Sequence, residues 1–222
     1  MKVIAKIRTD FPTKFGIPRQ SGLSDTVGTI VFEPQYRVDE ALRGIEEYSH
    51  LWLLWEFSEV GDKEWSPTVR PPRLGGNKRV GVFATRSPFR PNPVGLSCVE
   101  LVEVEKTQEG SVLIVKGADL MDGTPIYDIK PYIPYADCKS DAKGSFSQEK
   151  KDYVLDVVCD DSLLCVIPKD KQHTLLQILA QDPRPAYKDE ADRIYGFEYA
   201  TFEVKFTVKD TVLTVCEITK TK

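Results

Sequence analysis

The stretch GLSCVELVEVEKTQEGSVLIVKG, residues 95–117, predicts two β-strands joined by a tight turn. Valine, leucine and isoleucine dominate its two apolar segments, Gly95–Val104 and Val112–Gly117, and these side chains favour strands. The pair Glu109-Gly110 between the two segments is typical of a hairpin turn. A β-hairpin is therefore the first element that the sequence predicts.

Other strand patterns surround this hairpin. Lys2–Arg8 alternates apolar and charged residues, which is the period of a half-buried strand. The segment HLWLLWEF, residues 50–57, is apolar on both faces and predicts a central strand covered on two sides. The run Ile126–Tyr135 contains Pro131 and Pro134, which favours an edge strand or an ordered loop. Two further strands are expected at Val27–Phe32 and Val80–Thr85.

One helix is predicted in this part of the chain, over Val38–Tyr48. Its apolar residues Val38, Leu42 and Ile45 recur at helical spacing. Six or so strands with short connections and one early helix predict a closed or nearly closed β-barrel. A doubly wound nucleotide fold would need helices between its strands, and the sequence has neither those helices nor a Gly-rich fingerprint or P-loop.

The composition changes towards the C-terminal part. Residues 138–152 are polar and almost free of aliphatic side chains, which predicts a linker. Beyond it we expect a helix at Thr174–Gln181 and strands at Glu198–Val208 and Thr211–Thr219. The expected fold is mainly β with some α: a β-barrel domain at residues 1–137, the linker, and a small α+β domain at residues 153–222.

Positive charge is concentrated in one window of an acidic chain. The 222 residues carry a net charge of -4, whereas Arg70–Arg90 holds six Lys or Arg residues and no Asp or Glu. Because this window carries +6, the rest of the chain carries -10. A basic patch on an acidic protein is typical of a site for a polyanion.

Cysteine, histidine and hydropathy patterns exclude several classes. The five cysteines are scattered without a C-x-x-C pair and the two histidines lie far apart, so neither a disulfide framework nor a metal site is predicted. The longest apolar run, Leu51–Trp55, is too short to span a membrane. We expect a cytoplasmic protein with no membrane segment and no metal.

The segment TRSPFRPNPVG, residues 85–95, predicts a rigid loop that presents arginines. Prolines at short intervals exclude helix and central strand, and Arg86 and Arg90 emerge from this frame. Two interpretations stay open: the arginines either pair with Asp or Glu, or bind a phosphate, a carboxylate or a base edge.

The segment ADLMDGTPIYDIKPYIPYAD, residues 118–137, predicts a second functional loop. Asp122-Gly123 is a turn whose backbone amides and carbonyls could hold an adenine edge, and Asp128 and three tyrosines follow closely. IPRQSG (residues 17–22) could recognise a carboxylate or a ribose, although an ordinary solvated loop is equally expected. In QDPRPAY (residues 181–187), Arg184 lies between two prolines. This resembles Arg90 in the segment FRPNP, and Arg184 could contact a second anion. His50 is expected to be structural, and Trp52, Trp55 and Trp65 are expected in the core or at an interface in preference to stacking on bases.

Six motifs together resemble the TsaA/YaeB/TrmO family. They are, in order, PRQ-G (18–22), SHLW (49–52), TVRPPRLGGN (68–77), GVFATRSPFRPNPVGLS (81–97), DGTPIYDIKPY (122–132) and QDPRPAY (181–187). The resemblance implies a β-barrel methyltransferase that uses S-adenosylmethionine and forms a homodimer. It also implies a reaction, namely methylation of N6 of threonylcarbamoyl-adenosine next to the tRNA anticodon, at position 37.

Carried onto this chain, the resemblance implies the residues of the cofactor site. Arg19 or Arg86 would pair with the methionine carboxylate, and the backbone of Leu120–Thr124 would hold the adenine. The full set of expected cofactor contacts is Pro18, Arg19, Gln20, Ser58, Glu59, Arg86, Cys98, Leu120, Met121, Asp122, Gly123 and Thr124.

For catalysis, a proton must leave N6, so a nearby acceptor is expected. Asp128 is the predicted acceptor, with Tyr132 or Tyr127 orienting the base and Arg86 completing the site. The residues expected to contact RNA are Arg70, Arg73, Lys78, Arg79, Arg90 and Arg184, and the expected partner is the anticodon loop of tRNA. The rival hypotheses are a sensor module that binds S-adenosylmethionine or an adenine nucleotide without catalysis, and a structural adaptor.

Overall fold

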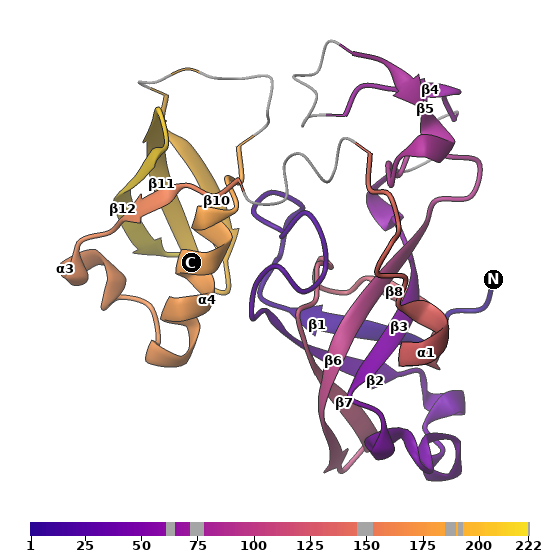
Figure 1. Cartoon of the computed structure of the whole chain (residues 1–222). Coiled ribbons are helices and arrows are strands. Elements are labelled where there is room, and N and C mark those ends of the chain that lie inside the picture. Colours follow the sequence, from indigo (N-terminus) through magenta and orange to yellow (C-terminus); the bar gives the residue numbers. More distant parts are fainter. Residues whose placement is uncertain (61–64, 72–77, 146–152, 185–189, 191–192, 222) are drawn as a thin grey trace.

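The computed structural model describes residues 1–60, 65–71, 78–145, 153–184, 190 and 193–221. In these residues, six antiparallel strands form a closed barrel with the order β1-β2-β7-β6-β3-β8 (Figure 1). The strands of the barrel are β1 (Ala5–Thr9), β2 (Val27–Phe32), β3 (His50–Glu56), β6 (Val94–Thr107), β7 (Gly110–Lys116) and β8 (Pro125–Pro131). The hairpin predicted for residues 95–117 is present as β6 and β7, and the barrel predicted for the N-terminal part is confirmed.

Every second side chain of a barrel strand such as β3 points into the barrel and fills its inside. In β3, Leu51, Leu53 and Trp55 point inward and are buried, whereas the residues between them are half-buried. The prediction that this strand is covered equally on two sides is therefore wrong, because its outer face remains accessible. The barrel core is completed by apolar side chains from the other strands, among them Ile7, Ile30, Val99, Leu113 and Ile126.

The strand β8 closes the barrel. It pairs with β1 on one side and with β3 on the other, so the edge strand or loop expected for Ile126–Tyr135 is a fully paired strand over its first part. Its prolines, Pro125 and Pro131, occupy the two ends, where a missing amide interrupts no central hydrogen bond. Tyr135 lies beyond the strand in the short helix α1 (Pro134–Asp137).

The helix predicted at Val38–Tyr48 is wrong. The chain forms short 3-10 turns instead: η1 (Pro34–Tyr36), η2 (Asp39–Leu42) and η3 (Ile45–Glu47). Gly44 separates the last two with a φ of 83°, a left-handed conformation that interrupts a helix. Leu42 and Ile45 still pack against the barrel core, so their apolar spacing serves burial without an α-helix.

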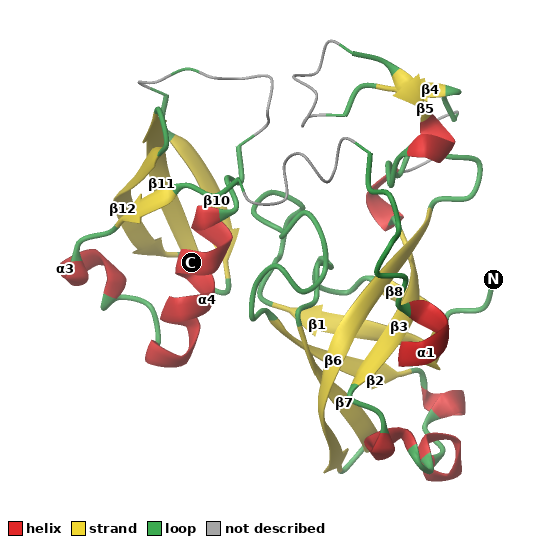
Figure 2. Cartoon of the chain, viewed as in Figure 1, coloured by secondary structure: helices red, strands yellow, loops and turns green. Residues whose placement is uncertain are grey.

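Between β3 and β6 the chain leaves the barrel in a long excursion, residues 57–93, which carries η4 (Ser58–Val60). A two-stranded ribbon, β4 (Thr68–Val69) with β5 (Val80–Gly81), stands away from the barrel on this excursion (Figure 2). The strand expected at Val80–Thr85 is therefore only two residues long. It continues into the 3-10 helix η6 (Val82–Ala84). Thr85 follows this helix, and its hydroxyl donates to the Val82 carbonyl oxygen at 2.8 Å.

The C-terminal part forms a separate four-stranded sheet with the order β10-β11-β12-β9. The strands are β9 (Asp156–Val158), β10 (Tyr195–Tyr199), β11 (Phe202–Lys209) and β12 (Val212–Lys220), accompanied by α3 (Asp161–Leu164) and α4 (Lys169–Ala180). The helix α4 begins at Lys169, five residues before the start expected at Thr174. The single strand expected at Glu198–Val208 is instead the hairpin of β10 and β11, turning at Ala200, whose φ is 54°.

The loop between β1 and β2, dark indigo in Figure 1, lies between the barrel and the C-terminal sheet. Phe11 from this loop is buried in the C-terminal core, and Phe15 and Ile17 pack against the same core. Gly16 has a φ of 93°, and an added Cβ would lie 2.2 Å from the ring of Phe197, so only glycine fits this approach. One loop thus joins the two parts of the molecule.

Within the described residues, no helix has the length and apolar character needed to cross a membrane.

Candidate active-site cleft

A cleft of about 870 Å³ opens at one end of the barrel. Three segments form it: the β1–β2 loop, the excursion between β3 and β6, and the segment that leads from β7 into β8. Its lining is mixed, with apolar walls and charges of both signs. The residues that line it are Lys14, Ile17, Pro18, Arg19, Gln20, Trp55, Glu56, Phe57, Ser58, Glu59, Val60, Thr85, Arg86, Pro88, Phe89, Arg90, Asn92, Val94, Gly95, Leu96, Asp119, Met121 and Thr124.

The β1–β2 loop and the excursion meet through their polar side chains. Gln20 accepts a hydrogen bond from the guanidinium of Arg86, so the two predicted cofactor contacts lie next to each other. The adjacent Ser21 accepts from the backbone amide of Cys98 at 3.2 Å, which ties the loop to β6. Cys98 is therefore an anchor for the loop, and its side chain does not line the cleft.

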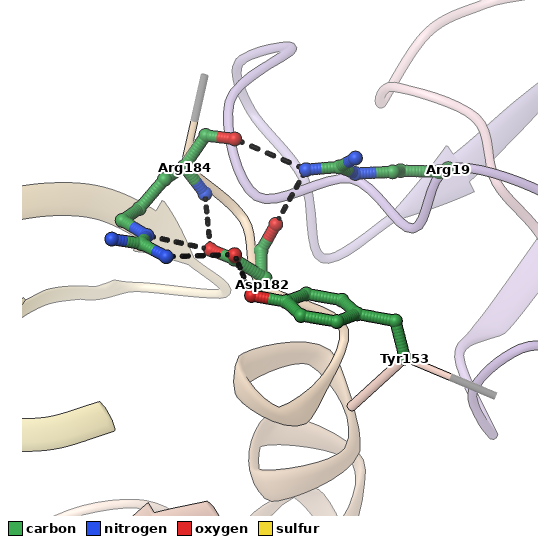
Figure 3. Close-up of polar contacts among 4 residues, drawn as sticks. All are labelled: Arg19, Tyr153, Asp182 and Arg184. Carbon is green, nitrogen blue, oxygen red and sulfur yellow. Dashed lines mark hydrogen bonds and ion pairs between the residues drawn. The ribbon is translucent and has the colours of Figure 1, made fainter. Parts of the chain in front are cut away.

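Arg19 also lines the cleft, but its guanidinium binds the C-terminal part of the protein (Figure 3). Nη2 donates to the carbonyl oxygens of Asp182 at 2.8 Å and Arg184 at 3.1 Å. These two carbonyls belong to the segment that follows α4. The contact fixes the position of the β1–β2 loop relative to the C-terminal sheet.

Arg184 lies in a buried ion pair. Its side chain is 8% exposed, and Nε and Nη2 donate to the two carboxylate oxygens of Asp182 at 2.8 and 3.0 Å. The hydroxyl of Tyr153 donates to the same carboxylate at 3.1 Å (Figure 3). Burial alone would raise the pKa of Asp182, but the hydrogen bonds and charge of Arg184 outweigh it and leave the pKa below its ordinary value. The expected contact of Arg184 with RNA phosphate is thus not what the structure shows, because its guanidinium faces a buried carboxylate.

The excursion contributes the other predicted cations. Arg86 is exposed at the cleft, and Arg90 donates to the carbonyl oxygens of Thr85 at 3.2 Å and Ser87 at 3.4 Å. The proline-rich loop is therefore braced by its own arginine, while Arg86 remains directed towards Gln20. Ser58 and Glu59, also expected at the cofactor site, line the same cleft.

Asp119 is a cleft carboxylate that the sequence did not single out. Ser97 Oγ donates to Asp119 Oδ1 at 2.5 Å, and Trp55 Nε1 donates to Ser97 Oγ at 2.9 Å, which fixes the orientation of both groups. Burial raises the pKa of Asp119, and the Ser97 hydrogen bond and the charge of Arg86 oppose that shift. An oriented carboxylate with a raised pKa beside a cation is typical of a functional site. Its only signal in the sequence is its place just before the Leu120–Thr124 turn.

The turn at Leu120–Thr124 uses part of its backbone for hydrogen bonds within the protein. The amides of Asp122 and Gly123 donate to the carbonyl oxygens of Phe11 and Ile7, both at 2.8 Å, and the Thr124 amide donates to Met121. The Asp122 and Gly123 amides therefore hold the β1–β2 loop and β1, so an adenine bound here would use other backbone groups of the turn. Met121 and Thr124 line the cleft, whereas Leu120, Asp122 and Gly123 do not.

Asp128 and Tyr132 lie outside the cleft lining. Asp128 Oδ2 forms an ion pair with Lys130 Nζ at 2.9 Å on the accessible side of β8. The ring of Tyr132 contacts Trp52, with centroids 5.8 Å apart. Tyr127 is closer to the site, because it hydrogen-bonds the cleft residue Glu56; burial, together with this contact, raises its pKa to about 12.

The predicted RNA contacts on the ribbon are accessible. Arg70, Lys78 and Arg79 are exposed beside β4 and β5, and none forms an ion pair with an acidic residue among those described. Arg73 lies outside the described residues. Within the same part of the chain, no group of three His, Cys, Asp or Glu residues could hold a metal ion.

A closed antiparallel barrel with a charged cleft of this volume at one end is typical of a protein that binds a small ligand. Two family models match the chain: the tRNA-methyltransferase O N-terminal domain over residues 6–138 and the TrmO C-terminal domain over residues 166–221. The chain belongs to the tRNA-methyltransferase O family.

Individual relatives agree with this assignment. The "tRNA (adenine(37)-N6)-methyltransferase" of Escherichia coli K12 is 43% identical over 216 residues, covering 93% of this chain and 92% of the relative. The protein of the same name from Eikenella corrodens is 44% identical and covers 73% of this chain and 92% of the relative. The crystal structure of TrmO from Pseudomonas aeruginosa superposes with a TM-score of 0.79 at 34% identity, covering 99% of this chain and 97% of that one.

Proposed function

We propose that this protein transfers a methyl group from S-adenosylmethionine to N6 of adenosine 37 in tRNA. The observation that supports it most strongly is the cleft, where Arg86, Gln20 and Asp119 converge next to an exposed basic ribbon. The Escherichia coli relative bears the name of this activity, and the two proteins align over nearly their whole lengths. A threonylcarbamoyl group on the target adenosine, implied by the family resemblance, is part of the proposal.

The cleft residues fit S-adenosylmethionine. A volume of about 870 Å³ is within the range of small-molecule sites. Arg86 would pair with the carboxylate of the methionine part, and Glu59 would accept from its ammonium group, since the cleft presents both signs of charge. The apolar side chains of Ile17 and Leu96 offer a surface for the adenine. When bound, S-adenosylmethionine supplies a methyl group that is already activated on a sulfonium.

The residues of the protein then have two tasks: alignment and removal of a proton. Holding two reactants in the correct geometry can supply about 7–11 kcal/mol. Because the loops carrying Gln20 and Arg86 are bound to each other and to β6, the cleft can provide such rigid alignment. We assign the proton acceptor to Asp119 in place of Asp128, because Asp119 lines the cleft and Asp128 is paired with Lys130 outside it.

Substrate RNA would approach over the ribbon. Arg70, Lys78 and Arg79 are exposed and Arg90 lines the cleft, so phosphate contacts from the ribbon would lead the RNA towards the site. We place the protein in the cytoplasm with its tRNA substrate.

We extend the proposal to a homodimer. The outer face of β3 and β8 carries accessible aromatic side chains, among them the half-buried Trp52 and, just beyond β8, Tyr135, which is 88% exposed. Apolar surface of this kind is typical of a contact between protein chains. Sedimentation of the purified protein measures the oligomeric state directly.

The decisive experiment incubates the protein with labelled S-adenosylmethionine and tRNA that lacks the methyl mark. Transfer of label to RNA is expected, and Asp119→Asn should lower turnover at least tenfold while Asp128→Asn changes it little. A reversed order of the two variants would move the proton acceptor back to Asp128. Tight binding of S-adenosylmethionine without transfer would instead support a sensor module.

A further inference from the structure

Two aromatic side chains stand exposed at the ribbon. Trp65 is 49% exposed and Phe83 is 74% exposed, and their rings lie 23° from parallel with centroids 6.4 Å apart. Trp65 precedes β4 and Phe83 lies in η6 after β5, so the pairing of Thr68 with Gly81 brings the two segments together. Neither ring belongs to a hydrophobic core cluster, so of the two places expected for Trp65, the core or an interface, the core is excluded.

The backbone under this aromatic pair is well ordered by hydrogen bonds. The amide of Val82 donates to the carbonyl oxygen of Pro67 at 3.0 Å, and the Val82 side chain is buried beneath η6. The two rings are therefore held side by side by the segments that carry them. A pair fixed in this way offers a binding surface whose side chains need little ordering when a ligand arrives.

The charge around the pair selects the kind of ligand. Arg70, Lys78 and Arg79 are exposed on the same ribbon, and no ion pair with a described carboxylate occupies them. A planar apolar surface beside exposed cations complements a ligand that has both flat rings and negative charges. Single-stranded nucleic acid has this composition, because its bases stack on aromatic side chains while its phosphates pair with Arg and Lys.

The pair also lies close to the cleft along the chain. Phe83 is three residues before Arg86, so their Cα atoms are at most about 11 Å apart. Thr85 and Arg86 both line the cleft. One RNA strand could therefore place a base in the cleft and a neighbouring base against the rings.

We propose that Trp65 and Phe83 form a stacking platform for an unpaired base of the RNA loop, next to the base that enters the cleft. This inference rests on the proposed function, since it assumes that RNA is the substrate. The platform recognises the flat face of a base and not its edge, so it selects unpaired structure with little preference for sequence. It would thereby favour a loop over a duplex.

The test compares binding to two RNAs, a stem-loop containing the anticodon loop and a duplex of the same stem without unpaired bases. Trp65→Ala and Phe83→Ala should each weaken binding to the stem-loop at least about fivefold and leave the weaker duplex binding unchanged. The dependence of affinity on salt should keep its slope, because no phosphate contact is lost. Trp65→Phe should retain most of the affinity.

Two control variants separate stacking from other effects. Arg79→Gln should weaken binding to both RNAs and reduce the salt slope by about one. Tyr48→Ala removes an exposed aromatic side chain that precedes β3, whereas the cleft lies at the far end of that strand, about 20 Å away. This control should bind both RNAs as the wild type does.

Three results would overturn the platform. The first is wild-type affinity for the stem-loop in both alanine variants. The second is an equal loss of affinity for stem-loop and duplex. The third is a change in sedimentation of the RNA-free variants, which would make the pair a contact between copies of the chain. Failure of the wild type to bind any RNA would reject the proposed function as well, whereas binding without methyl transfer would reject only the proposed reaction.

Discussion

The two arginine-proline motifs of this chain end in opposite environments. Arg90 lines the cleft, is only partly buried, and donates to the backbone carbonyls of its own loop. Arg184 is buried at the junction between the C-terminal sheet and the β1–β2 loop, and its charge is balanced by Asp182. One motif shapes the site, and the other holds together the two parts of the molecule that carry it.

The cause of the difference lies two residues before each arginine. Asp182 gives Arg184 a carboxylate within reach, and a guanidinium can be buried when such a partner neutralises it. The corresponding residue before Arg90 is Pro88, whose side chain accepts no hydrogen bond, so the guanidinium uses carbonyl oxygens and stays near solvent. A local carboxylate therefore decides whether a proline-flanked arginine becomes a structural or a surface group.

The largest effect is expected when the buried pair is broken. Asp182→Asn should lower the free energy of unfolding by about 3–5 kcal/mol, because the charge of Arg184 then stays buried without a counter-charge. Asparagine tolerates the φ of 52° at this position, so the variant tests the charge and not the backbone. Chemical denaturation measures the change. Glu217→Gln is the control. It breaks the exposed Lys205–Glu217 pair between β11 and β12 and should change stability little.

The pH dependence of that difference tests the charge itself. The folded pKa of Asp182 lies below its unfolded value of about 3.9, so its stabilisation is complete well above that pH and is lost as the pH falls towards the folded value. The gap in unfolding free energy between the wild type and Asp182→Asn should be constant near neutrality and shrink below about pH 4. A gap that persists undiminished in acid would show that packing, not ionisation, separates the two proteins.

A smaller effect is expected where the junction meets the cleft. Arg19→Lys removes the guanidinium Nη2 that bridges the carbonyls of Asp182 and Arg184, so the β1–β2 loop should hold the cofactor less well. We expect the KM for S-adenosylmethionine to rise about tenfold with little change in kcat, because the loss concerns binding. Arg37→Lys is the matched control, since Arg37 also donates to two carbonyls, those of Phe32 and Glu109, away from the cleft. Equal rises in KM would refute a specific role for Arg19.

The smallest effect on the folded protein is expected at the ribbon. Arg70→Gln should leave the unfolding transition unchanged, because this side chain is exposed, while each lost phosphate contact reduces the salt slope of RNA binding by about one. Affinity measured at several salt concentrations, together with a thermal melt, checks both expectations. A destabilised fold with an intact salt slope would make Arg70 resemble Arg184 and remove the contrast between the two regions.

Much of the barrel could be predicted because strand alternation is a local property. The bounds of β2, Val27–Phe32, agree with the prediction, and the hairpin of β6 and β7 follows from its apolar runs and turn. The error at Val38–Tyr48 has a local cause as well: Gly44 breaks the helix, yet Leu42 and Ile45 still reach the core that their spacing indicated. The apolar spacing predicted that Leu42 and Ile45 face the core, but it did not predict the backbone conformation that places them there.

The site was harder to predict because its members act through distant partners. Asp119 is oriented by Ser97 and Trp55, which belong to other strands, and nothing in its own segment indicates that pairing. The amides of Asp122 and Gly123 lie in the predicted turn, but the carbonyl oxygens of Phe11 and Ile7 already accept from them. Motif resemblance located Pro18, Gln20 and Arg86 at one cleft, whereas the availability of each group depended on the tertiary structure.

The insertion of Phe11 into the C-terminal core has a consequence for the order in which the enzyme matures. The ribosome delivers Phe11 long before Tyr199, whose ring centroid lies 5.8 Å from that of Phe11, and before Phe206 and Ile218 of the same core. The barrel strands can pair earlier, but the loop that carries Pro18 to Gln20 reaches its final place only when those late strands close around it. A nascent chain would therefore lack a finished site until β10, β11 and β12 have been made.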